Sequence, residues 1–139
     1  MAVDPIAAVR SILLSDATIE PLVGDRVFGG AIPADENAAM PRACVLLSPA
    51  GGGLIGRGYQ DYADTRIDTH CYGSTPHEAW MLHLAVRAVL TQLRRQVSNS
   101  VLIHWARISS DGALARDHAK EWPLCYASYQ VLAATVAAD

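Results

Sequence analysis

The chain has 139 residues, of which 51% are apolar and 18% charged, and a formal net charge of -3. This length suits a single domain over residues 1–139 that can bury a core without disulfides or metals. The net negative charge gives no electrostatic footprint for a nucleic-acid binder. We interpret the local basic group at Arg87, Arg94 and Arg95 as a solvated helix end, where positive charge is favourable.

The first residues carry no positive charge, and the apolar run at residues 12–14 is too short for a signal peptide or a membrane span. Cys44, Cys71 and Cys125 are far apart, and each falls in a predicted strand. An odd, sparse set argues against a disulfide framework and suits a reducing compartment. A metal site built from the three is conceivable, but buried strand cysteines are common without any role. We expect a soluble protein, made in the cytoplasm or in a particle assembled there.

Two short helices are predicted at the N-terminus. Asp4 followed by Pro5 is a typical helix start, and apolar residues recur at helical spacing until residues 15–16. A second, shorter helix is expected over residues 18–23, where Gly24 can end it.

Extended and irregular segments follow. A brief extended segment is predicted at residues 26–28, and residues 31–41 are expected to form an irregular connection. The apolar run within residues 42–48 fits a buried strand, and the alternating pattern of residues 64–73 fits another. Between them, residues 49–58 are so rich in glycine that we expect a mobile loop joining two antiparallel strands.

The glycine-rich loop matches a dinucleotide fingerprint by spacing alone. That fingerprint needs a helix after the loop, whereas here a strand follows. A mobile loop can instead become ordered against a partner. The candidate partner-contact residues are Gly51, Gly52, Gly53, Leu54, Ile55, Gly56 and Arg57.

A capped, apolar helix is predicted after the second strand. Thr75 and Glu78 form a capping box around Pro76, and neither Pro nor Gly interrupts residues 79–96. Because successive residues of a helix are rotated by about 100°, apolar residues gather on one face, which we call the core stripe. This stripe consists of Ala79, Leu82, Val86, Val89, Leu90 and Leu93, while His83, Arg87, Thr91, Arg94 and Arg95 fall on the other side.

Four further apolar residues of this helix fall outside the core stripe: Trp80, Met81, Leu84 and Ala88. One interpretation is that a loop or another element of the same domain covers them. The other is a subunit interface, because contiguous exposed apolar area with a Trp and a Met often marks protein contact.

The rest of the chain is predicted to be mostly strand. Residues 98–100 break the pattern, residues 101–108 and 122–136 form strands, and residues 110–112 mark a turn. No hydrolase motif is present, and the histidines have no diagnostic metal-ligand spacing. We therefore expect no catalytic residue, no metal and no cofactor.

The order of several local patterns resembles a known family. Residues 22–28 (Leu-Val-Gly-Asp-Arg-Val-Phe) follow a short helix, Pro41 leads a strand, and residues 66–73 (Arg-Ile-Asp-Thr-His-Cys-Tyr-Gly) precede the helix from Glu78 to Leu93. Over nearly the whole chain, this order resembles the tailed-phage tail terminators, or tail-completion proteins, which also occur in gene-transfer particles.

The resemblance implies a structural virion protein and no enzyme. Members of this family form a ring, typically a hexamer, that caps the tail tube, stops its polymerisation and joins the tail to the head. The implied partners are other copies of the chain, the tail tube protein and a head connector or stopper protein. The resemblance also implies that the genome passes through the ring without sequence-specific recognition and that no membrane is involved. The implied location is a virion tail or gene-transfer particle, assembled in the host cytoplasm.

We therefore expect an α+β domain in which an antiparallel or mixed β-sheet packs against one long helix, with two short N-terminal helices. The alternative function is a small-molecule-binding or enzymatic α+β domain with a pocket between helix and sheet. A third, a nucleic-acid-binding ring near the genome channel, needs a basic lumen that the net charge does not promise.

Overall fold

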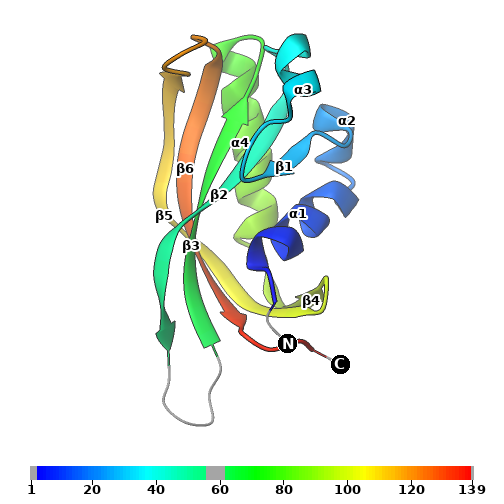
Figure 1. Ribbon diagram of the computed structural model, residues 1–139, viewed down its shortest axis with the longest axis vertical. Coiled ribbons are helices and arrows are strands. Elements are labelled where there is room, and N and C mark those ends of the chain that lie inside the picture. The colour runs from blue at the N-terminus through cyan, green and yellow to red at the C-terminus, as the bar shows by residue number, and fades with distance from the viewer. Residues whose placement is uncertain (1–2, 56–61, 139) are drawn as a thin grey trace.

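The computed structural model describes residues 3–55 and 62–138 (Figure 1). Helices and strands alternate irregularly along this part of the chain. The helices are α1 (Pro5–Ser15), α2 (Glu20–Val23), α3 (Ala34–Ala39) and α4 (Pro76–Leu90). The strands are β1 (Val27–Gly29), β2 (Cys44–Ile55), β3 (Tyr62–Tyr72), β4 (Arg94–Ser98), β5 (Val101–Arg116) and β6 (Pro123–Ala134).

The six strands form one mixed sheet in the order β1-β2-β3-β6-β5-β4. β1 pairs in parallel with β2, and every other pairing is antiparallel. The sheet curls into a half-barrel. As a result, α1 contacts both edge strands of the sheet, β1 and β4. α4 packs on β3, β5 and β6, and Figure 1 shows both helices on the same side of the sheet.

The main core lies between the helices and one face of this sheet. Alternate residues of β6, from Cys125 to Ala133, are buried there together with Leu82 and Val86 of α4 and Val9 and Leu13 of α1. A smaller cluster of Cys44, Tyr72 and Leu124 lies apart from it, packed by Phe28, Ile32, Met40 and Trp122 among others. This cluster lies on the second face of the sheet, away from the main core, where Arg66, Asp68 and Ser128 also meet.

The expected fold class is wrong. The molecule is a mixed six-stranded, curled half-barrel with short helices, and not a sheet packed against one long helix. α4 has 15 residues and shares the cover of the sheet with α1. The difference arises because α4 ends at Leu90, although neither Gly nor Pro follows before residue 97. The hydroxyl of Thr91 donates to the Arg87 carbonyl (2.7 Å), and the chain then turns to pair β4 with β5, a tertiary contact that overrides helix propensity.

Three other expectations about local structure are wrong. Residues 31–41 are not wholly irregular, since they contain α3. Residues 49–55 are not a mobile loop but the second half of β2, paired with β3 through an irregularity between Pro49 and Gly52. Residues 110–112 do not form a turn between strands, because β5 continues through them with shifts in its pairing to β6.

Several predicted elements are confirmed. α1 begins after Asp4, whose carboxylate accepts the Ile6 amide (3.0 Å), and Gly24 caps α2 with a φ of 59°. β3 covers most of residues 64–73, and β6 covers most of residues 122–136. Cys44, Cys71 and Cys125 are all free and buried in strands.

Candidate subunit-contact surfaces

The start of α4 is fixed by its junction with β3. The Thr75 hydroxyl accepts the Glu78 amide (3.1 Å), as the capping box predicts, and the Glu78 carboxylate accepts the Ser74 amide (2.9 Å). Gly73 is needed at this junction, because a β-carbon there would lie 2.6 Å from the Ala79 nitrogen. These contacts fix the direction in which α4 crosses the sheet and therefore which of its side chains face outward.

The four candidate interface residues of α4 do not share one environment. Met81 is 49% exposed and Ala88 is exposed, while Leu84 is half-buried. Trp80 packs against the main core, with its ring centroid 5.4 Å from that of His83. The outward apolar surface of α4 is thus carried by Met81, Leu84 and Ala88, and Trp80 is partly covered by its own domain.

Met81 belongs to a wider apolar surface that sequence reasoning missed. A shallow cleft of about 180 Å³ lies beside it, lined by Pro21, Leu22, Ala43, Glu78, Met81 and Leu82. Leu22 of α2 is 43% exposed. It belongs both to the helix predicted over residues 18–23 and to the segment that carries the family resemblance, but no contact role was predicted for it. We call the group Pro21, Leu22, Ala43 and Met81 the α2–α4 patch.

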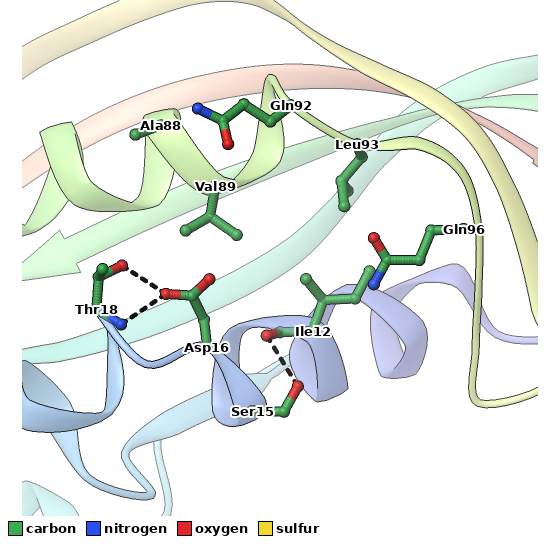
Figure 2. A pocket seen from close by; sticks show the side chains of 9 residues that line it. All are labelled: Ile12, Ser15, Asp16, Thr18, Ala88, Val89, Gln92, Leu93 and Gln96. Carbon is green, nitrogen blue, oxygen red and sulfur yellow. Dashed lines mark hydrogen bonds between the residues drawn. The ribbon is translucent and has the colours of Figure 1, made fainter.

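A larger cleft separates the end of α1 from the end of α4, and Figure 2 shows its two walls. Its volume is about 510 Å³. Ile12, Val89 and Leu93 supply apolar surface, and Asp16 is the only charged side chain in the lining. Ala88 links this α1–α4 cleft to the outward surface of α4. The other lining residues are Ser15, Thr18, Gln92 and Gln96.

The Asp16 carboxylate is held in place by the turn that follows α1. It accepts hydrogen bonds from the Thr18 amide (2.8 Å) and from the Thr18 hydroxyl (Figure 2). The hydroxyl bond is the main reason that the pKa of Asp16 lies below its ordinary value. The cleft therefore carries a fixed negative charge at neutral pH. In the sequence, the only feature that distinguishes Asp16 is its place at the end of a predicted helix, so its role in the cleft was not predicted.

A buried histidine joins α4 to β5. His83 was expected on the polar side of the helix, and this expectation is wrong, because its side chain is fully buried. Its Nε2 lies 3.0 Å from Asp111 Oδ1, and Arg87 donates to Asp111 Oδ2 (2.8 Å). Burial lowers the pKa of His83. The pKa of Asp111 is also lowered, mainly because the Gly112 amide donates a hydrogen bond to the Asp111 carboxylate.

This His–Asp pair lies near a thiol, but the thiol is not activated. A β-carbon on Gly112 would lie 2.7 Å from Cys125 Sγ and 2.6 Å from the His83 ring, which places all three groups together. Burial raises the pKa of Cys125 to about 11, so the sulfur carries its proton at neutral pH. The arrangement fits a structural link between α4 and the irregular part of β5 better than a nucleophilic site.

The glycine-rich candidates divide into two groups. Gly51, Gly52 and Gly53 lie in β2 with exposed backbone, and the backbone of residues 54–55 continues the strand. Gly52 has a φ of 131°, and a β-carbon there would lie 2.0 Å from the Asp64 carbonyl oxygen, so only glycine fits. Gly56 and Arg57 lie outside the described residues. The contact role of this segment stays a prediction.

The face of the sheet away from α1 and α4 carries a polar network. The Ser128 hydroxyl donates to Asp68 and accepts from Arg66 (3.1 Å), with Tyr126 Oη also 3.1 Å away. Beside it, Arg107 Nε donates to Gln130 Oε1 (2.8 Å). The Arg107 guanidinium also lies over the Trp105 ring, 5.1 Å from its centroid. Sequence reasoning found the alternation in β3 but not this network, whose members are distant in the chain.

Two further features bear on function. Within residues 3–55 and 62–138, no three His, Cys, Asp or Glu side chains are grouped in a way that could hold a metal ion. In the same part of the chain, no helix combines the length and the apolar character needed to cross a membrane.

Comparison with known proteins shows a structural likeness over nearly the whole chain. No protein-family model matches this chain, and no curated protein matches it. A chain in a solved structure described as the virion of a native gene transfer agent (GTA) particle is similar, with a TM-score of 0.62 and 17% sequence identity. The match covers 93% of this chain and 93% of that one. The half-barrel fold is therefore shared with a chain of a gene transfer agent particle.

Proposed function

We propose that this chain is a structural protein of a phage-like particle and acts there as the tail terminator. The observation that carries the proposal is the fold that it shares, over 93% of both chains, with a chain of a gene transfer agent virion. The order of residues 22–28, Pro41 and residues 66–73 supports the finer assignment, because it resembles tail terminators.

The mechanism is steric. Copies of the chain form a closed ring, a hexamer in the family it resembles, and one face of this ring seats on the end of the tail tube. A closed ring leaves no growing edge, so tube polymerisation stops. The opposite face meets the head connector or stopper protein, and the genome passes through the centre. Assembly takes place in the host cytoplasm, and the product is a virion tail or gene-transfer particle.

The surfaces of the molecule suit a ring. Neighbours in a ring meet through two different surfaces, so each subunit must carry one of each kind. The outward side of α4 with the α2–α4 patch offers exposed apolar area at Met81 and Leu22. The opposite face of the sheet offers the polar network around Ser128 and Arg107. The glycine-rich half of β2, in this proposal, contacts the tail tube.

Immunogold electron microscopy of particles with an epitope tag after residue 139 tests the proposed position. We expect gold at one point, where the tail meets the head. A control tag on the tube protein should label the whole length of the tail. Gold along the tube, on the head shell alone or absent from purified particles would contradict the proposal.

A small-molecule-binding role has one supporting observation, the α1–α4 cleft, whose volume lies within the range of about 300–1,000 Å³ typical of ligand sites. Asp16 is the only titratable group in its lining, so the cleft lacks the acid–base pair that most hydrolytic chemistry uses. A thermal-shift screen of metabolites checks this alternative. A stabilising compound whose effect disappears in Gln92→Ala would favour it.

A further inference from the structure

The polar face of the sheet carries a cationic side chain that two neighbouring side chains contact. Arg107 is exposed, yet its Nε bonds Gln130 and its guanidinium stacks on Trp105. The pairing of β5 with β6 brings these three side chains together. Gln130 of β6 lies opposite Arg107, and Trp105 lies two residues before Arg107 on β5, opposite Leu132. Stacking and the Nε bond restrict the side chain while its terminal nitrogens stay available. A Trp and an Arg held together in this way are typical of residues that dominate binding energy.

Most other arginines in the described residues already have partners. Arg42 pairs with Glu36, Arg66 with Asp68 and Arg87 with Asp111. Those that donate to backbone carbonyls are Arg10, Arg26, Arg94 and Arg116. The one that remains, Arg95, lies on β4 next to Gln96, which lines the α1–α4 cleft.

The α1–α4 cleft has the complementary properties. Asp16 supplies a negative charge that Thr18 holds in position, and the amides of Gln92 and Gln96 add hydrogen-bonding groups. Ile12, Val89 and Leu93 supply apolar surface for the stem of a long side chain or for an aromatic ring. The cleft lies on the helical side of the molecule, whereas Arg107 lies on the opposite face of the sheet.

We propose that the Trp105–Arg107 pair of one copy inserts into the α1–α4 cleft of the next copy, with the Arg107 guanidinium against the Asp16 carboxylate. This inference rests on the proposed function and names the contact that closes the ring. It joins opposite faces of successive subunits, so it propagates around a ring instead of stopping at a two-fold dimer. Pairing of Arg95 with Asp16 would instead join like surfaces and give a dimer.

A charge exchange tests the contact in the purified full chain, by size-exclusion chromatography with light scattering up to the solubility limit. We expect the native chain to form a closed oligomer larger than a dimer. Arg107→Glu and Asp16→Arg should each weaken association by about tenfold or more, because each places like charges together. The double variant, Arg107→Glu with Asp16→Arg, should restore the oligomer. Arg95→Glu is the matched control and should leave it intact.

Four outcomes would overturn the inference: a native chain that stays monomeric, single reversals without effect, a double variant that fails to recover, or rescue of Asp16→Arg by Arg95→Glu. Circular dichroism of each variant separates loss of association from loss of fold. Particles carrying Arg107→Glu separate this contact from the proposed function. If the function is right and the contact is wrong, Arg107→Glu leaves both the oligomer and the tail length unchanged. If the contact is right and the function is wrong, Arg107→Glu abolishes the oligomer while the tails keep their normal length.

Discussion

Gly112 illustrates how a single residue fixes the link between α4 and β5. A β-carbon there would lie 2.6 Å from the ring of the fully buried His83, which has no space to move away. We expect Gly112→Ala to lower the free energy of unfolding by about 1–3 kcal/mol, the usual cost of overpacking a core. Gly53→Ala is the control, because a β-carbon there meets no atom within 4 Å. Urea denaturation measures both, and equal stability of the two variants would contradict this account.

His83 should also make stability depend on pH. Its pKa is lowered by burial from the ordinary 6.5, so the unfolded chain takes up a proton at a higher pH than the folded chain does. Stability therefore falls as the pH drops from about 6.5 towards the folded-state pKa, by at most about 1.4 kcal/mol per pH unit for one proton. His70, whose pKa burial also lowers, contributes in the same direction.

Denaturant titrations between pH 5 and 8 measure this dependence. In His83→Asn the slope of stability against pH should be smaller than in the native chain, because the residue that takes up the proton only on unfolding is gone. An unchanged slope in His83→Asn would show that His83 does not titrate differently in the two states.

At the scale of elements, the start of α4 depends on a local cap. Removing the Thr75 hydroxyl leaves the Glu78 amide without its acceptor, so Thr75→Ala should cost about 1 kcal/mol. Ser74→Ala is a matched control, since Ser74 contributes its backbone amide and not its hydroxyl to the cap. Thermal denaturation of the two variants compares them. A Ser74 variant as unstable as the Thr75 variant would argue against a specific cap.

Elements set by short-range signals could be predicted from the sequence. The starts of α1 and α4 follow from Asp4 and Thr75, whose side chains bond amides two or three residues away. The end of α4 could not, because nothing local stops the helix before residue 96 and only pairing of β4 with β5 does so. The strand in the glycine-rich half of β2 could not be predicted either, for the same reason. It depends on pairing with β3, whose backbone lies so close to Gly52 that only glycine fits there.

The candidate surfaces also divide into those that a local sequence pattern predicts and those that only the tertiary structure creates. Exposure of Met81 and Ala88 followed from helical periodicity, since both fall outside the core stripe of one helix. The α1–α4 cleft unites residues 12–18 with residues 88–96, and only the curled sheet brings these segments together. Arg107 and Gln130 likewise become neighbours only through the pairing of β5 with β6. No spacing within one segment indicates either contact.

At the scale of the whole molecule, the α2–α4 patch should contribute to assembly and not to folding. Met81 is 49% exposed, so Met81→Asp should leave the unfolding temperature nearly unchanged while weakening association of copies. Val136→Asp is the control, because Val136 is 48% exposed and lies outside the patch. Analytical ultracentrifugation of both variants measures the effect. Equal association of the Met81 variant and the native chain would exclude the patch from the interface.

The proposed function requires that this chain ends tail growth. Electron microscopy of particles from a genome that lacks the gene measures it most directly, through the distribution of tail lengths and the fraction of tails joined to heads. We expect overlong tubes of variable length without heads, and recovery of uniform, head-bearing tails when the native gene is supplied. Tails of uniform length attached to heads in the absence of the gene would contradict it.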